Sequence, residues 1–182
     1  MQPIGPLMWE HRTIEHAVRL MDEGLVRMKR TGVLETRFLE LSADFIRTYA
    51  DRTHHGKEED ILFRELSKKP LSNEDRAVMD ELIAEHVKGR ELTRKVLAAL
   101  ELRDRDANAG MAMVTDALEQ LCLLYPAHIE KEDKRFFHPV MRYFDRGEMD
   151  RMLLEFEDFD RQLIHERYKA RLDEMRDAAR GH

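Results

Sequence analysis

The feature that most constrains this chain is the spacing of its apolar residues, which recur at intervals of three and four along most of its length. In the first segment the steps alternate strictly between four and three residues. Those seam positions are Leu7, His11, Ile14, Val18, Met21, Leu25 and Met28. This spacing puts them on one face of an α-helix, the pattern typical of helices that pack together in a bundle. The sequence therefore predicts a helical protein.

Breaks in the repeat divide the chain into helical segments. The segments that we predict are 6–30, 35–67, 73–103, a fourth that follows the polar stretch 103–106 and contains Pro126, and 148–178. Four long amphipathic helices joined by short polar loops favour an all-α, up-down-up-down four-helix bundle. The fifth segment has an interrupted apolar face. We expect an additional C-terminal helix that packs on the bundle or forms a homodimer contact, so that 1–145 is the bundle domain and 146–182 an appendage.

Composition excludes several classes of protein. The single cysteine, Cys122, rules out a disulfide framework and any CxxC metal or redox motif. No apolar run approaches the roughly 20 residues that a membrane helix needs. The formal net charge of −6 argues against nucleic acid as a partner. The first residues lack a basic stretch followed by an apolar one, so we expect a cytoplasmic protein.

Histidines occupy seam positions where a bundle helix normally carries an apolar residue. His11, His86 and His128 lie on three different predicted helices, each on its apolar face. One such histidine is usually a core residue with a polar partner, but burying several imidazoles together is costly unless each is satisfied. A metal ion satisfies all of them at once. The pattern therefore indicates a metal site inside the bundle.

Two His-x-x-x-Glu pairs add carboxylates to this set. His54 and Glu58 on the second helix, like His128 and Glu132 on the fourth, are one turn apart on a common face. A single pair of this kind is more simply explained as a surface pair in so charged a chain. Together with the histidines of the first and third helices, the pairs give four imidazoles and two carboxylates. Such mixed ligands suit iron, manganese or zinc, and a bridging carboxylate would allow a dinuclear centre.

The residues of the second helix leave one choice open. A straight helix extended from the apolar stripe earlier in that segment directs His55 and Glu59 inward, about 100° from His54 and Glu58. Gly56 and the charged residues before it make that extrapolation uncertain. From helical phase alone, either pair could face the metal.

The motifs also stand in a recognisable order. They are Glu10-His11-Arg12, His54-x-x-x-Glu58-Glu59-x-Ile61-Leu62-Phe63, Glu85-His86, and His128-x-x-x-Glu132 followed by Phe136-Phe137 and Pro139. In order, spacing and helix placement, the chain resembles the hemerythrin-like (HHE cation-binding) family over roughly residues 6–145. The resemblance implies a non-haem di-iron centre in a four-helix bundle.

The resemblance also implies a ligand set. Its members would be His11, His54, Glu58, His86, His128 and Glu132. Glu58 and Glu132 would bridge two iron ions, with manganese or zinc as alternatives. The motif selects His54 over His55, which becomes an outer residue or an extra ligand to one metal. Asp133 keeps the spacing of the fourth-helix aspartate of oxygen carriers, but Glu132 lies on the apolar seam, so we prefer Glu132.

One departure from the family bears on function. Oxygen-carrying hemerythrins have a second histidine one turn after the third-helix histidine, where this chain has Arg90. The loss of that imidazole implies a more open metal and argues against reversible oxygen transport. The resemblance then points to sensing of oxygen, nitric oxide or redox state, or to iron handling and iron-centre repair. The alternative is an oxidoreductase that turns over oxygen, peroxide or nitric oxide, for which the chain would need an external reductant.

Overall fold

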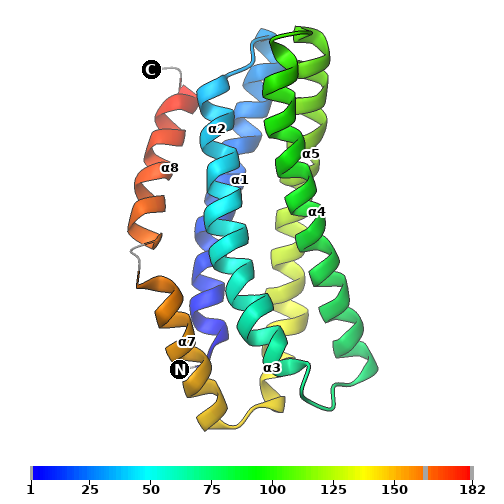
Figure 1. Cartoon of the computed structure of the whole chain (residues 1–182), viewed down its shortest axis with the longest axis vertical. Helices are drawn as coiled ribbons and strands as arrows, with labels where there is room; N and C mark the ends of the chain where they lie inside the picture. Colours follow the sequence, from blue (N-terminus) through cyan, green and yellow to red (C-terminus); the bar gives the residue numbers. More distant parts are fainter. Residues whose placement is uncertain (1, 162–163, 181–182) are drawn as a thin grey trace.

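The computed structural model describes residues 2–161 and 164–180. In these residues the regular secondary structure is entirely helical, and turns and loops join the helices. Residues 1, 162, 163, 181 and 182 lie outside the described part. Four long helical stretches lie side by side along the long axis of the molecule (Figure 1). The all-α prediction is therefore confirmed. In the described residues, no helix is both long and apolar enough to cross a membrane.

The first and third stretches are single α-helices with the ends that the sequence signals. Helix α1 (Ile4–Thr31) ends at Gly32, whose left-handed backbone (φ 68°) lets its N–H donate to the carbonyl of Met28. Helix α4 (Asn73–Arg103) begins after Ser72, whose hydroxyl accepts the backbone N–H of Asp75 at 3.1 Å. Basic residues before a glycine, and a serine before an apolar repeat, were sufficient to place these ends.

The second and fourth stretches are composite. The second contains α2 (Thr36–Phe45), the π-helices η1 (Ile46–His55) and η2 (Glu58–Phe63), and the short α3 (Arg64–Leu66). The fourth contains α5 (Ala107–Lys131), the π-helical η3 (Glu132–Phe136), α6 (Phe137–Val140) and the 3₁₀ turn η4 (Met141–Tyr143). The wider π turns occur where the histidine and glutamate motifs lie, and such turns are frequent at functional sites.

The predicted C-terminal helix is divided. Its described part forms α7 (Arg146–Asp160) and α8 (Ile164–Arg180), which follow one another along the side of the bundle (Figure 1). Asp145 begins α7 with a reciprocal capping box: its carboxylate accepts the Glu148 N–H, and Glu148 accepts the Asp145 N–H. The expectation of one continuous helix over 148–178 was thus wrong. The residues between the two helices lie outside the described part.

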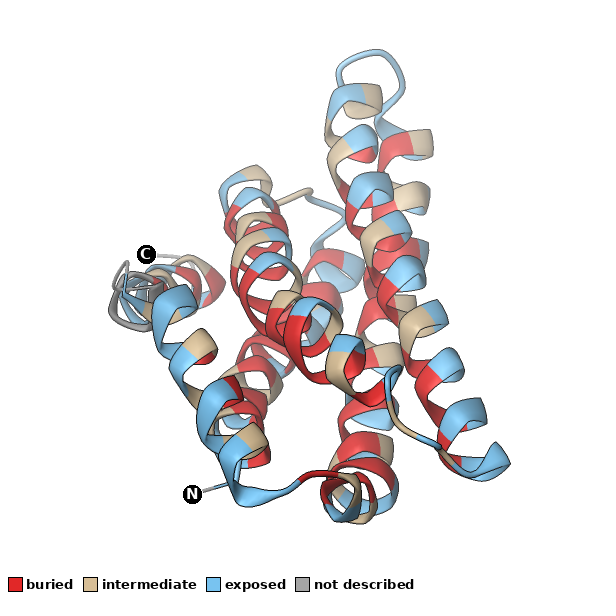
Figure 2. Ribbon diagram, turned by 60° about the horizontal axis from the view of Figure 1, so that its bottom comes forward, coloured by how far each residue is buried: buried red, intermediate tan, exposed pale blue. Residues whose placement is uncertain are grey.

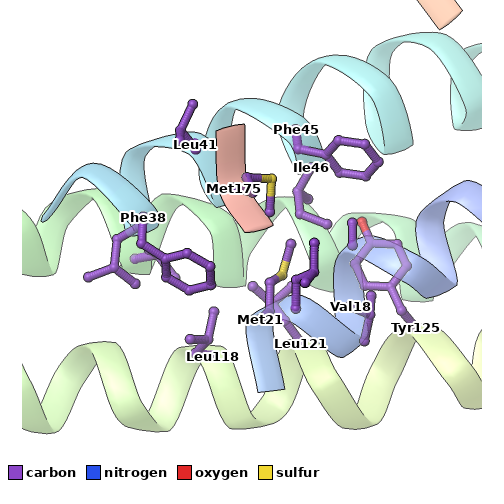
Figure 3. Packing of buried hydrophobic residues seen from close by; sticks show 14 of the residues in the cluster. Val18, Met21, Phe38, Leu41, Phe45, Ile46, Leu118, Leu121, Tyr125 and Met175 are labelled. Atoms are coloured by element: carbon purple, nitrogen blue, oxygen red, sulfur yellow. The ribbon is translucent and has the colours of Figure 1, made fainter. Parts of the chain in front are cut away.

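The apolar core falls into two clusters, one towards each end of the bundle. One joins the long helices to α8 through residues such as Met21, Phe45 and Met175, as Figure 3 shows in close-up. The other includes Leu7 and joins the opposite ends of the long helices to α7. Figure 2 shows buried positions facing the interior of the bundle on every long helix. On α1 the two clusters are separated by the turn that carries His11, so a polar layer lies between them.

Gly24 allows α1 and α2 to approach closely. A Cβ atom at this position would overlap the ring of Phe38. We expect Gly24→Ala to lower the free energy of unfolding by about 1–3 kcal/mol, the usual cost of overpacking a core. Gly147→Ala, in the first turn of α7, is the matched control, since its nearest neighbour would lie 3.4 Å away. Chemical denaturation should show a loss for the first variant alone, and equal effects of the two would contradict this packing.

Candidate metal centre

The structure brings all six residues of the predicted ligand set together in the polar layer. Each is buried, with exposed fractions between 0% and 3%. Their possible ligand atoms form two groups, and within each group these atoms lie within 4.8 Å of one another. One group is His11, His54, Glu58 and Glu132, and the other is His55, Glu58, His86 and His128. Glu58 belongs to both groups, the arrangement that a carboxylate between two ions requires.

The side chains of His55 and His54 are both buried in the interior of the bundle, although the sequence analysis treated the two as alternatives. Their exposed fractions are 2% and 1%. Both lie in the π-helical η1, whose wider turn reduces the angle between successive side chains below the 100° of an α-helix. The ring of His55 is stacked on that of His86, with centroids 3.8 Å apart. His55 therefore adds to the predicted set rather than replacing a member of it.

The imidazole Nε2 atoms point at the two interior carboxylates. His54 and His86 place Nε2 3.4 Å from different oxygens of Glu58. His11 and His128 place Nε2 3.1 and 3.3 Å from one oxygen of Glu132. Each carboxylate thus lies between a histidine of one group and a histidine of the other. These are the positions expected of carboxylates that are shared by two ions.

The opposite ring nitrogens of four histidines are held by a second layer of carboxylates. The Nδ1 contacts are His11 with Asp133 at 2.7 Å, His54 with Glu10 at 2.8 Å, His86 with Glu59 at 2.6 Å and His128 with Glu85 at 2.8 Å. A carboxylate at Nδ1 fixes the tautomer and orientation of a metal-binding imidazole and raises its basicity. Sequence reasoning did not assign this outer role to any of the four acids.

Each outer carboxylate is in turn paired with a basic side chain. The pairs are Asp133 with Arg12, Glu10 with Lys57, Glu59 with Arg90 and Glu85 with Lys131. The hydrogen bonds from His86 and Arg90 outweigh burial and lower the pKa of Glu59, and those from His128 and Lys131 do the same for Glu85. Glu59 and Glu85 therefore stay ionised as acceptors for the imidazoles of His86 and His128.

Arg90 takes part in this outer layer and belongs to neither group of possible ligands. Its guanidinium donates to Asp51 at 2.7 Å and to Glu59 at 2.6 Å. The imidazole expected one turn after His86 is absent from α4, but the ring of His55, from the second helix, lies in the same group. His55 thus places a third imidazole in this group from another helix, where the sequence analysis expected an imidazole to be missing.

Buried polar atoms without hydrogen-bond partners indicate whether the site suits a cation. Nine buried side-chain atoms in the described residues have no hydrogen-bond partner, and eight of them belong to His11, His54, His55, Glu58 and Glu132. Buried polar groups without partners cost free energy, so native proteins rarely concentrate them. Imidazole nitrogens and carboxylate oxygens that converge on one small volume are donors that a transition-metal ion can bind. The residues fit a cation.

The pKa shifts of Glu58, His54 and His55 agree with the fit. At His11, by contrast, the hydrogen bonds to Asp133 and Glu132 outweigh burial and raise the pKa to about 9, so a metal ion there would displace a proton. Burial, reinforced by the neighbouring Glu132, raises the pKa of Glu58 well above its ordinary range. Two adjacent buried carboxylates are therefore costly to ionise unless a cation lies beside them. Burial also lowers the pKa values of His54 and His55, which keeps these imidazoles neutral, the form that binds metal.

Helix α7 reaches the same layer through a buried lysine. Lys57 has a fully buried side chain that bonds Glu10, the partner of His54, and donates to Asp160 of α7 at 2.9 Å. The ring of Phe156, also in α7, lies 5.7 Å from the ammonium group. The C-terminal region is thereby connected to the site by a chain of charged groups.

Comparison with known proteins agrees with this arrangement. A family model described as "Hemerythrin HHE cation binding domain" matches residues 3–140, which is about three quarters of the chain. The match spans every residue of the two groups and ends within α6. No curated protein and no solved structure matches the chain.

Proposed function

This chain belongs to the hemerythrin HHE cation-binding family, and we propose that it holds two iron ions with which it senses a small ligand or oxidant. The observation that carries the proposal is the pair of four-residue groups that share Glu58. One ion would be held by His11 and His54, the other by His55, His86 and His128. Glu58 and Glu132 would lie between them. The proposal takes the long helices in up-down-up-down order, which the chain path in Figure 1 supports.

The donor set favours iron over zinc. Five imidazoles and two carboxylates exceed what one four-coordinate zinc ion accepts, and none of the donors is a thiolate. Mixed nitrogen and oxygen donors suit iron and manganese. When bound, iron would supply a change of oxidation state and an affinity for oxygen or nitric oxide. Those diatomic molecules, with peroxide as the oxidant, are the proposed partners.

The protein's own residues perform three tasks at the site. The outer carboxylates hold the imidazoles in one orientation, so little reorganisation is needed when a metal binds. The basic residues beyond them balance the negative charge of that layer. The apolar clusters on either side exclude water, and the low exposure of every donor admits only small molecules.

The same burial favours sensing over iron delivery. A protein that passes iron to other proteins needs ligands that solvent or a partner can reach. Here the most exposed donor is His128, at 3%, and four of the five imidazoles are fixed by a paired carboxylate. Metal release would require this double layer to open. The geometry therefore supports a resident metal pair and a sensing role rather than iron transfer.

Metal analysis tests the proposal. After anaerobic reconstitution and removal of loosely bound iron, the protein should retain about two iron ions per chain, since two donor groups are present. Addition of nitric oxide should change the visible spectrum of the iron-loaded protein and leave a zinc-loaded sample unchanged. Retention of no metal would overturn the proposal. Retention of iron with no spectral response to nitric oxide or oxygen would overturn the sensing role alone.

A further inference from the structure

A cavity of about 260 Å³ lies between the second helix and α4, beside the candidate metal centre. Its polar lining residues are Arg47, Asp51, His55, Arg90, Thr93, Arg94 and Tyr125. Unlike the two groups of possible ligands, its lining includes three arginines. It reaches one metal-site residue, His55, from the side of the bundle.

Three arginines and one carboxylate line this cavity. Arg90 is already bonded to Asp51 and Glu59, and the guanidinium of Arg47 lies 3.6 Å from the carboxylate of Asp44 in the preceding turn. Arg94 is different: it donates from Nε to the backbone carbonyl of Arg90 at 3.3 Å and forms no ion pair within residues 2–161 and 164–180. Its guanidinium therefore has donors available for an anion.

Two buried polar groups of the cavity lack partners. The hydroxyl of Tyr125 is buried and makes no hydrogen bond, and Figure 3 shows it pointing from α5 towards the second helix. His55 has neither ring nitrogen satisfied. Its Nδ1 lies 3.6 Å from Asp51, too far for a hydrogen bond, because Arg90 holds that carboxylate at 2.7 Å.

His55 is thus the exception in the outer layer. The other four imidazoles each have a side-chain carboxylate within 2.8 Å of Nδ1. At His55 the equivalent place opens to the cavity. An anion from solution could occupy that place and accept a hydrogen bond from His55, as carboxylates do at the other four histidines.

We propose that this cavity binds a small oxoanion, which accepts hydrogen bonds from Arg94, from the hydroxyl of Tyr125 and from the outer ring nitrogen of His55. The ligand class follows from the donors: one guanidinium, one phenol and one imidazole N–H converge on a space that is large enough for a tetrahedral anion. The inference rests on the proposed function only for the metal-binding role of His55. The anion would replace, at this histidine, the carboxylate that protein residues supply to the others, and would thereby adjust its basicity.

Calorimetric titration of the iron-loaded full chain with inorganic phosphate tests the proposal, with the iron content measured before and after. We expect one site per chain, and about tenfold weaker binding in Arg94→Ala and in Tyr125→Phe, since each removes one charge-assisted hydrogen bond. Arg76→Ala, an exposed arginine of the same helix away from the cavity, should bind like the original protein. Phosphate should also shift the visible spectrum, and in Tyr125→Phe about tenfold more phosphate should be needed for the same shift.

The outcomes separate this inference from the proposed function. Absence of binding to iron-loaded protein, or equal affinity in all variants, overturns the anion site and leaves the metal proposal standing. Phosphate binding that depends on Arg94 and Tyr125 in protein that retains no iron supports the cavity and overturns the metal proposal. Unchanged circular dichroism of the variants would exclude misfolding as the cause of a loss.

Discussion

Replacement of Glu58 or Glu132 by glutamine should reduce the metal content from about two ions per chain to less than about half an ion. Each change removes one of the two interior carboxylates, and with it half of their negative charge and one of the two groups that would lie between the proposed ions. Loss of an outer partner alone typically costs 10- to 100-fold in metal affinity, so loss of a shared ligand should cost more than about 100-fold.

The stability of the metal-free variants shows whether a loss of metal is caused by misfolding. Because burial and Glu132 raise the pKa of Glu58, the metal-free protein already bears the cost of two adjacent carboxylates. Neutral glutamine relieves that cost, so metal-free Glu58→Gln should be at least as stable as the metal-free original. Glu15→Gln, on the same helix as His11 but outside both groups, should leave the metal content unchanged. Equal losses in all three variants would mean that the site lies elsewhere.

Much of the fold follows from the sequence because it depends on local interactions. The three-and-four repeat, the glycine at 32 and the serine at 72 determine helices whose ends depend on neighbouring residues only. The six predicted donors meet in one layer for a related reason. Four of them, His11, His86, His128 and Glu132, lie on the apolar seams of their helices, and a bundle brings its seams together.

The choice between His54 and His55 could not be made in this way. An argument from 3.6 residues per turn allows only one of two successive side chains to face inward, whereas the π-helical η1 brings both inside. The conformational preferences of the residues in this segment do not predict a π-helical turn. It becomes favourable through the contacts that both imidazoles make with other helices.

The outer carboxylates show a second limit. Glu10 precedes His11 in the chain but bonds His54, and Glu85 precedes His86 but bonds His128. Successive residues of an α-helix point about 100° apart, so a carboxylate next to a histidine in sequence faces the neighbouring helix instead. The histidine that it contacts depends on how far the two helices are shifted along their axes relative to each other. The spacing of side chains within one helix does not determine this shift.

The buried lysine of the outer layer should have the largest effect on stability. Lys57 has a fully buried side chain, and its ammonium group bonds Glu10 and, in α7, Asp160. In Lys57→Met the carboxylate of Glu10, which is 1% exposed, would remain buried without its cation. We expect the free energy of unfolding to fall by about 3–5 kcal/mol, the usual cost of leaving one member of a buried ion pair.

A surface pair supplies the matched control. Lys134 pairs with Glu130 one turn away, and its side chain is 70% exposed. Lys134→Met should therefore change stability by no more than about 0.5 kcal/mol. Urea denaturation of both variants measures the difference, and equal effects would show that burial of Lys57 contributes nothing.

A double variant identifies the cause of the loss. If the unpaired carboxylate is responsible, Glu10→Gln should restore a large part of the stability when it is added to Lys57→Met, because the residue left behind is then neutral. If the loss comes instead from the contacts of the lysine stem with α7, the two changes should add. The amide that replaces the Glu10 carboxylate would still accept a hydrogen bond from His54 but carries no charge, so the double variant should regain stability without binding metal better than Lys57→Met. Additive losses of stability would contradict a stabilising buried ion pair between Lys57 and Glu10.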